Sequence, residues 1–346
     1  MALRIAVIGC GKVTQRLALP QLAACPDARI GALVDVNRRV AQAVARRCGV
    51  DRRLVWTDWR RMLRQADVDA VAICVPNDLH AEVAVAALSA GTHVLVEKPM
   101  ALTLAEADRM IAAANAHRRV LMVEQTQRFE PAHEVAYALL RRGALGAILQ
   151  GRGRLGHAGP EYWSRTSPWF LQLRRAGGGA LMDVGIHMLD LLRWLSGKDV
   201  ARICCQAKTL RKHTTVEDNA SALLEWTDGT LGSCEVSWTT RPYEVTTDWY
   251  GTCGTLRTRL GAAHPVAIDW SHADGRPKRV SARQHYPAVP KRSRWGGAYA
   301  YFVRCILTGT RPFVSGEEGR KSLETVLAAY ESARTGRWVT LPLRRR

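Results

Sequence analysis

The chain has 346 residues, of which 47% are hydrophobic, and this length favours two domains over a single small module. Its formal net charge of +19 comes from 50 Lys and Arg residues against 31 Asp and Glu residues, but the basic residues are spread along the whole chain, so we expect a basic surface and no nucleic-acid partner. The sequence begins without the pattern of a signal peptide, and charged or Gly residues interrupt every apolar run before the length of a membrane span, which predicts a soluble, cytoplasmic protein with no membrane partner.

The first third of the chain alternates short apolar runs with segments of helical periodicity. Strands are expected at residues 4–8, 30–34, 70–75, 93–96 and 120–123, and helices at residues 13–24, 38–48, 79–90 and 104–117. Strands that are apolar throughout and alternate with amphipathic helices indicate a parallel sheet covered on both faces. The fold class predicted for residues 1–124 is therefore α/β, a doubly wound dinucleotide-binding domain of the Rossmann type.

The pattern changes after about residue 125, where a second domain is expected to run to residue 346. Helices are predicted at residues 131–142, 181–195, 296–307 and 317–333, and strands at residues 201–210, 219–226, 230–239 and 244–250, with an aromatic loop before the second of these helices. The stretch 261–295 is expected to be the least regular. This spacing predicts an α+β domain with a large, mostly antiparallel sheet that binds substrate and self-associates as a homodimer or homotetramer.

A glycine pattern follows the first predicted strand and opens the first helix. It reads Gly9-Cys-Gly11-Lys12-Val13-Thr14, and in this position it predicts a dinucleotide site in which Gly9 makes the turn and Gly11 admits the pyrophosphate. Thr14 stands where a third glycine is usual, which is expected to loosen helix packing slightly. Asp35, at the end of the second strand, favours NAD through the adenosine ribose, whereas Arg38 next to it leaves NADP open.

The nine cysteines include no C-x-x-C pair, and no other metal-ligand spacing occurs, so neither a disulfide scaffold nor a metal site is predicted.

Three further stretches carry polar residues in a fixed order along the chain: Val75-Pro76-Asn77-Asp78-Leu79-His80, Glu97-Lys98-Pro99, and Gly177-Gly-Gly followed by Asp183, His187 and Asp190. Together with the glycine loop, this ordered set resembles the Gfo/Idh/MocA oxidoreductase family over nearly the whole chain. The resemblance implies that Lys98, Asp183 and His187 face the nicotinamide. It also implies that the cofactor is lined by Pro76, Asn77, His80, Glu97 and Pro99.

The chain departs from the family pattern after the strand at residues 120–123. Arg128 matches the family's arginine and is expected to contact the cofactor, whereas Glu124 and Thr126 stand where glycine and asparagine are usual. This departure predicts altered contacts on the nicotinamide side and a reshaped substrate pocket.

The residue types fit alcohol oxidation, which requires a base for the hydroxyl proton and a cation for the developing oxyanion. His187 and Lys98 are able to divide these tasks, with Asp183 orienting the imidazole, because residues 183, 187 and 190 share one helix face. A neutral Lys98 is the alternative base, since a cationic nicotinamide disfavours the ammonium. The sequence leaves both assignments open.

The predicted function is interconversion of a secondary alcohol and a ketone on a pyranose sugar, sugar derivative or cyclitol by hydride transfer with NAD or NADP. Aromatic and basic residues in the loop before the third stretch are expected to contact this substrate: Tyr162, Trp163, Arg165 and Trp169. Two alternatives are an NAD-dependent glycosidase that oxidises its sugar transiently, and a non-catalytic NAD(P)-binding regulator.

Overall fold

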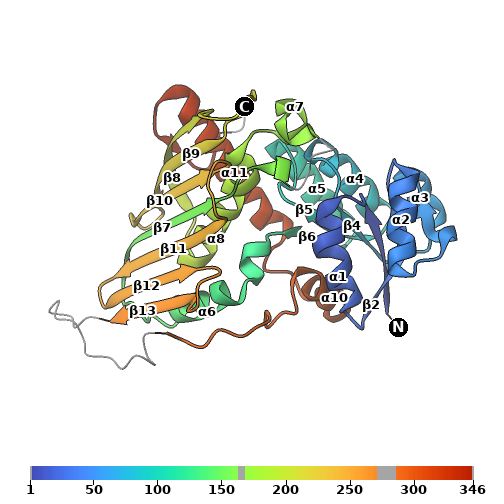
Figure 1. The fold of residues 1–346 in the computed structure, drawn as a ribbon, viewed down its shortest axis with the longest axis horizontal. Helices are drawn as coiled ribbons and strands as arrows, with labels where there is room; N and C mark the ends of the chain where they lie inside the picture. Colours follow the sequence, from blue (N-terminus) through green and yellow to red (C-terminus); the bar gives the residue numbers. More distant parts are fainter. Residues whose placement is uncertain (1, 163–167, 271–285, 345–346) are drawn as a thin grey trace. The chain divides into compact units, whose positions relative to one another are not determined.

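The computed structural model describes residues 2–162, 168–270 and 286–344, and the chain divides into two compact units (Figure 1). The N-terminal unit comprises Met1–Gln125, Arg174–Gly177 and Trp295–Leu323. The C-terminal unit comprises Thr126–Leu173, Gly178–Arg294 and Glu324–Arg346. The sequence analysis drew a single boundary after residue 124, whereas in the structure two later segments belong to the N-terminal unit.

The N-terminal unit is built on a six-stranded parallel sheet of order β3-β2-β1-β4-β5-β6. Its strands are β1 Leu3–Ile8, β2 Ala28–Val34, β3 Val55–Trp56, β4 Ala70–Ile73, β5 His93–Glu97 and β6 Leu121–Glu124. The strand order reverses between β1 and β4, and a doubly wound sheet binds its ligand outside the carboxyl ends of the strands at this point. The predicted Rossmann-type sheet is confirmed, and β3 is an addition to it.

Helices connect the strands of this sheet. They are a π-helical turn Thr14–Ala18, α1 Leu19–Ala23, α2 Arg38–Cys48, α3 Trp59–Gln65, α4 His80–Ser89, α5 Leu104–Ala116 and, from the late segment, α10 Ala298–Thr308. Local sequence sets their ends. The Asn37 side chain caps the start of α2, which ends at Gly49 with φ of 64°, and Thr103 and Glu106 form a reciprocal capping box at the start of α5.

The C-terminal unit contains an eight-stranded sheet of order β13-β12-β11-β7-β10-β9-β8-β14. Its strands are β7 Ile148–Gly156, β8 Val200–Lys208, β9 Asn219–Trp226, β10 Leu231–Ser237, β11 Glu244–Gly251, β12 Gly254–Arg259, β13 Val266–Trp270 and β14 Val339–Thr340. Among the described residues, β7 and β10 pair in parallel and the other neighbours pair antiparallel. The predicted large, mostly antiparallel sheet is confirmed.

One strand was missed, because no strand was predicted at residues 148–156, where β7 runs. The strand lies in the middle of the sheet, between β10 and β11, and it separates two strands that follow each other in the sequence (Figure 1). The glycines of β7 weakened the sequence signal of a strand, since glycine is a poor strand former. They are required here: a Cβ on Gly151 would lie 2.4 Å from the Trp249 ring, and one on Gly153 would lie 2.2 Å from the Met188 sulfur.

Helices cover one face of this sheet, and the other face is exposed. A π-helical turn Leu181–Gly185 leads into α8 Ile186–Ser196, which packs on β7 and β10, while α6 Pro131–Arg141 packs on β12 and β13. Shorter elements are the 3-10 turns Asn77–Leu79, Thr126–Phe129, Pro160–Tyr162 and Pro168–Leu171, with α7 Leu173–Ala176. The last helix, α11 Gly316–Thr335, begins in the N-terminal unit and ends in the C-terminal unit. Of the helices in the described residues, none combines the length and the apolar character that a membrane span requires.

Candidate active site

The glycine loop lies at the carboxyl end of β1, where Gly9 has φ of +94°. A Cβ on Gly9 would lie 2.2 Å from the carbonyl oxygen of Cys74, so only glycine fits between β1 and β4. Gly11, by contrast, has open space where a side chain would be, and Lys12 next to it is exposed. The turn is therefore closed on the side of the sheet and open on the side where a ligand would approach.

Thr14 fills the third position of the glycine pattern. Its side chain is fully buried, and its Oγ1 donates to the carbonyl oxygen of Gly9 at 2.5 Å. The expected loosening is not what the described contacts indicate, because the hydroxyl ties the first helical turn back to the loop. The amide of Gln15 donates to the carbonyl of Gly11, which shows that helical hydrogen bonding begins inside the glycine pattern.

Asp35 ends β2 and contacts the glycine loop directly. One carboxylate oxygen accepts from the Cys10 amide at 2.9 Å, and the other accepts from the Asn37 amide at 2.8 Å. Arg38 follows at the exposed start of α2. The carboxylate is thus fixed beside the loop and keeps lone pairs that are able to accept from a ribose hydroxyl. Arg38, three residues further along the chain, is able to pair with a ribose phosphate. The two side chains therefore fit either NAD or NADP.

The turn after β4 is held by His80 and Asn77. The His80 ring is fully buried, with Nδ1 2.7 Å from the carbonyl oxygen of Pro99 and Nε2 2.9 Å from that of Val75. Burial lowers the pKa of His80. Both ring nitrogens therefore face the backbone of two loops, and the contact that the structure shows for His80 is structural.

Asn77 lies in the same turn, next to Pro76. Its amide nitrogen donates to the carbonyl oxygen of Ala176 at 2.9 Å, and Asp78 beside it pairs with Arg175 at 3.2 Å. These contacts attach the short segment 174–177 to the N-terminal unit. The predicted contacts of Pro76, Asn77 and His80 with a cofactor stay predictions.

The Glu97-Lys98-Pro99 turn ends β5 at the same edge of the sheet as the glycine loop, because the strands are parallel. Lys98 is half-buried, and its charge acts on the buried carboxyl of Glu124 at the end of β6. Glu97 and Glu124 are register partners on the two neighbouring strands. An acidic pair therefore stands next to the lysine that the sequence analysis assigned to catalysis.

In the C-terminal unit, Asp183 lies in the π-helical turn before α8 and is nearly buried. Its Oδ2 accepts from the Trp238 indole at 2.9 Å and lies 3.5 Å from Nε2 of His157. The His157 Nδ1 accepts from the Gly159 amide at 2.9 Å, so the neutral ring carries its proton on Nε2, which faces the carboxylate. Asp183 thus has an imidazole partner that the sequence analysis did not name.

His187 lies in the first turn of α8 and is buried, with 9% of its surface exposed. Asp190, one turn further, forms a bidentate ion pair with Arg128, with both distances 2.7 Å. Both side chains are buried, at 1% and 0% exposure. Arg128 is thus the partner of Asp190. The predicted common face of residues 183, 187 and 190 and the predicted contact of Arg128 with a cofactor stay predictions.

The four residues predicted to contact substrate are only partly described. Tyr162 is 55% exposed and has the Arg241 guanidinium 4.9 Å from its ring centre, and Trp169 stacks on Phe170 with ring centres 3.8 Å apart. Trp163 and Arg165 lie outside the described residues. The exposed, cation-backed ring of Tyr162 is the better candidate for a sugar contact, because Trp169 already has an aromatic partner.

Sequence reasoning missed His157, Trp238 and Tyr299, each of which contacts a polar site residue. His157 follows β7 directly, so recognition of that strand from the alternation of Arg152, Arg154 and the residues between them would have placed it at a strand end. Trp238 and Tyr299 left no comparable signal, because each comes from a segment remote in sequence from its partner.

The residues present fit a nicotinamide dinucleotide. The described loop offers the open approach at Gly11, the first amides of a helix that have no partner within it, and an anchored acid at Asp35. These are the groups that bind a pyrophosphate and a ribose, and they lie at the switch point of the sheet.

Comparison with known proteins agrees with this fit. Residues 3–125 match the family model described as an oxidoreductase family with an NAD-binding Rossmann fold, and residues 133–257 match the GFO/IDH/MocA C-terminal domain. The chain is 29% identical to D-apiose dehydrogenase of Paraburkholderia graminis over 97% of this chain and 89% of that protein. It is 30% identical to inositol 2-dehydrogenase of Paracoccus denitrificans over 78% of this chain and 81% of that protein.

Among solved structures, the chain is similar to the WlbA dehydrogenase of Bordetella pertussis in complex with NADH and UDP-GlcNAcA. The TM-score is 0.86 at 26% identity, and the match covers 99% of this chain and 100% of that one. The ordered motifs, the two family models and the relatives agree in both units, and the chain belongs to the Gfo/Idh/MocA family of oxidoreductases.

Proposed function

We propose that this protein is an NAD(P)-dependent dehydrogenase or ketoreductase that interconverts a secondary alcohol and a ketone on a pyranose sugar, sugar derivative or cyclitol. The observation that carries the proposal is the position of Lys98, at the carboxyl end of β5 and on the same sheet edge as the loop at Gly9 and Gly11. The substrate class is supported by the relatives, which are named as dehydrogenases of sugars and inositols.

The chemistry assigned to the chain's own residues is proton transfer and charge stabilisation. The bound dinucleotide supplies the acceptor or donor of the hydride. In the direction of oxidation, a base takes the hydroxyl proton while a cation stabilises the negative charge that grows on oxygen. We propose that Lys98 and His187 share these tasks and that both reach the same substrate oxygen.

Asp183 contributes to this arrangement from the turn that precedes α8. Its carboxylate is anchored by the Trp238 indole and faces the His157 imidazole, so a fixed negative charge lies four residues before His187. We propose that this charge favours the imidazolium that forms when His187 accepts a proton.

The direct test is absorbance of the reduced nicotinamide over a panel of pyranoses, glycosides and inositols, with NAD and NADP measured separately. Lys98→Met and His187→Asn are expected to lower kcat by about 100-fold to 10,000-fold each, the range for a positioned acid, base or cation. Matched controls are Lys208→Met and His213→Asn, which change exposed residues of the same types. Unchanged turnover in both site variants would refute the assigned roles.

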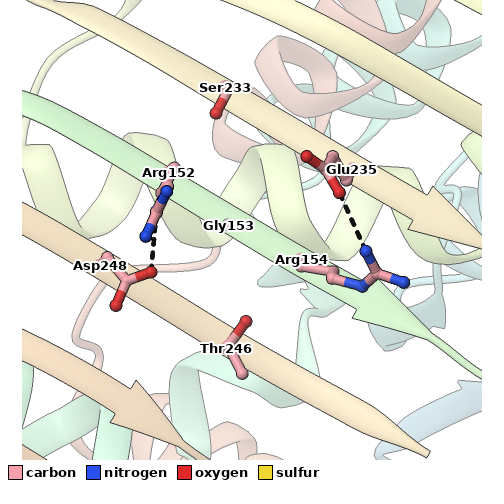
Figure 2. A pocket seen from close by; sticks show the side chains of 7 residues that line it. All are labelled: Arg152, Gly153, Arg154, Ser233, Glu235, Thr246 and Asp248. Carbon is pink, nitrogen blue, oxygen red and sulfur yellow. Dashed lines mark hydrogen bonds and ion pairs between the residues drawn. The ribbon is translucent and has the colours of Figure 1, made fainter.

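We further propose that the exposed face of the C-terminal sheet mediates self-association. Figure 2 shows a shallow pocket on this face, lined by Arg152, Gly153, Arg154, Ser233, Glu235, Thr246 and Asp248. Arginines and acids alternate across its strands, with Arg152 2.9 Å from Asp248 and Arg154 3.0 Å from Glu235. Such a surface is self-complementary in charge, as a two-fold interface requires.

Two leucines on the same face supply apolar area next to these charges. Leu223 of β9 and Leu231 of β10 are 56% and 54% exposed. Leu223→Asp with Leu231→Asp is expected to convert a dimer or tetramer to monomers in light scattering at physiological salt, whereas Leu307→Asp, at a similarly exposed site on α10, is not. A wild-type protein that is monomeric at all concentrations would contradict this proposal.

A cytoplasmic location is proposed because all nine cysteines are free thiols in the structure and most are buried or half-buried.

A further inference from the structure

The carboxyl ends of β5 and β6 place two glutamates side by side. Glu97 and Glu124 are register partners on adjacent parallel strands, so their side chains lie on the same face of the sheet. Glu124 is fully buried, and Oε1 of each carboxyl is shielded from solvent. Within the described residues neither Oε1 atom has a hydrogen-bond donor. Two buried acceptors that face each other without a donor require a proton between them.

The other oxygen of Glu124 has a donor from a remote segment. The Tyr299 hydroxyl of α10 donates to Glu124 Oε2 at 3.2 Å, and Tyr299 is 1% exposed. The same hydroxyl lies 3.7 Å from the Cys74 sulfur at the end of β4. Glu124 is therefore enclosed by β4, β5 and α10, and its geometry is fixed from two sides.

Several titratable groups of the described residues act on this acidic pair. Cys74, Glu97, Lys98 and Tyr299 act on Glu124, and His80 acts on Glu97 from the turn after β4. Burial, the charge of Glu97 and the hydrogen bond to Glu97 all raise the pKa of Glu124 well above its ordinary value of 4.5. Burial also raises the pKa values of Cys74 and Tyr299, so these groups stay neutral. Lys98 is the cation of the cluster.

We infer that Glu124 is a neutral carboxylic acid that donates a hydrogen bond to the Glu97 carboxylate, and that through Glu97 it positions the charge of Lys98. The order of donors is Tyr299 to Glu124 and Glu124 to Glu97. This arrangement satisfies both orphaned oxygens and leaves one negative charge, on the residue that immediately precedes Lys98. Glu124 is a positioning residue in this account, because it acts through Glu97.

The consequence for catalysis rests on the proposed function. A carboxylate held next to Lys98 supplies the lysine with a counter-charge, and this assigns Lys98 to stabilisation of the oxyanion. His187 is then the base. The acidic pair favours this assignment over the alternative in which a neutral Lys98 is the base.

The proton on Glu124 is testable without cofactor or substrate. In the infrared spectrum of the apo protein near neutral pH, the carbonyl stretch of a protonated carboxylic acid is expected in wild type and is expected to decrease in Glu124→Gln. Glu217, a half-buried glutamate whose pKa is also raised, contributes its own band, so the wild type minus variant difference is the measurement. Glu134→Gln, which changes a buried glutamate of the C-terminal unit, is the control. A difference spectrum without that band would overturn the inference, whatever the substrate proves to be.

The coupling to Lys98 is tested by the pH profile of kcat/KM in two variants. Glu124→Gln carries an amide that donates to Glu97 as the neutral acid does, whereas Glu124→Leu has similar size and no donor. The leucine variant is expected to move the alkaline limb of the profile to lower pH by about one unit, because the shielded Glu97 carboxylate loses its donor, which disfavours its charged form and weakens the counter-charge of Lys98. The glutamine variant is expected to restore the wild-type position of that limb.

Two outcomes would contradict this coupling: an unshifted limb in Glu124→Leu, or a shift in Glu124→Gln as large as in Glu124→Leu. Melting temperatures of both variants identify any loss of fold. If wild type oxidises no sugar or cyclitol, the proposed function fails, and the infrared measurement still decides the state of Glu124.

Discussion

Asp190 accepts two hydrogen bonds of 2.7 Å from the Nε and Nη2 atoms of Arg128, and both residues are buried, with at most 1% of either residue exposed. Parallel, charge-assisted bonds of this kind fix both orientation and distance. The pair joins the 3-10 turn at Thr126–Phe129 to the middle of α8, one turn after His187. It therefore sets the position of the helix that presents His187.

The first prediction concerns this pair. Asp190→Asn leaves a buried guanidinium without its counter-charge, and we expect it to lower the free energy of unfolding by about 3–5 kcal/mol. Arg128→Met combined with Asp190→Leu is expected to recover most of that loss. Urea denaturation followed by tryptophan fluorescence measures both. Arg154→Met, which breaks an exposed pair with Glu235, is the control and is expected to cost at most about 1 kcal/mol.

The second prediction separates folding from cofactor binding within one loop. Gly9→Ala places a Cβ against the Cys74 carbonyl and demands a positive φ, so it is expected to destabilise the N-terminal unit. Gly11→Ala meets no atom within 4 Å and is expected to leave thermal stability nearly unchanged while it weakens NAD binding. Calorimetric melting and titration with NAD distinguish the two effects. Equal loss of stability in both variants would contradict the described loop geometry.

The third prediction concerns the choice between NAD and NADP. Asp35→Ser removes a charge that repels a ribose phosphate, while a hydroxyl remains to accept from the Cys10 amide. We expect the ratio of NAD to NADP affinity to fall by about tenfold to 100-fold, the value of one charge-assisted hydrogen bond. Adding Arg38→Ala should remove the gain in NADP binding. Fluorescence titration with each cofactor provides the ratio, and an unchanged ratio would exclude Asp35 as the selecting residue.

The fourth prediction is a loss of stability in acid that originates at His133. This ring is fully buried, its Nδ1 lies 2.8 Å from the Gln127 carbonyl oxygen, and burial lowers its pKa from 6.5 to about 4. Between these values the unfolded chain binds the proton and the folded chain does not, so lowering the pH favours unfolding. The contribution of His133 to the slope of the unfolding free energy against pH approaches about 1.4 kcal/mol per pH unit. His93 in the N-terminal unit has its pKa lowered to about 4 in the same way.

The matched variant is His133→Gln, whose side chain does not titrate. Its stability is expected to decline less steeply than that of wild type as the pH falls below about 6.5, the ordinary pKa of the imidazole. Parallel curves for the two proteins, obtained by urea denaturation at a series of pH values, would show that His133 is not the source.

The N-terminal half of the fold was predictable because its physical signals are local. Buried parallel strands are apolar throughout, and Gly9 stands at a turn that no other residue fits, so sequence and structure coincide there. The C-terminal sheet was harder, since β7 gains its stability from Trp249 and Met188 over its glycines, and these contacts join residues remote in sequence. Pattern reasoning has no access to such packing.

The same difference between local signals and long-range contacts applies to the residues of the candidate site. The order of the polar motifs identified Lys98, Asp183 and His187 as candidates, because each lies next to a recognisable strand or helix. The partners of the site residues could not be identified from the sequence. His157, the partner of Asp183, follows the strand that was missed, and Tyr299, the partner of Glu124, is remote in sequence. The acid at Glu124 was noted only as a departure from the family, and its role depends on a register partner that only the assembled sheet provides.

The N-terminal unit includes a segment from late in the sequence, Trp295–Leu323. Tyr299 bonds to Glu124, and the Val123 amide donates to the Val314 carbonyl, so the edge strand β6 is completed by a segment that leaves the ribosome late. During translation the edge of the nascent Rossmann sheet therefore stays uncovered until residues 299–314 have been synthesised. Truncation near residue 295 is expected to damage the N-terminal unit, although most of that unit lies before residue 126.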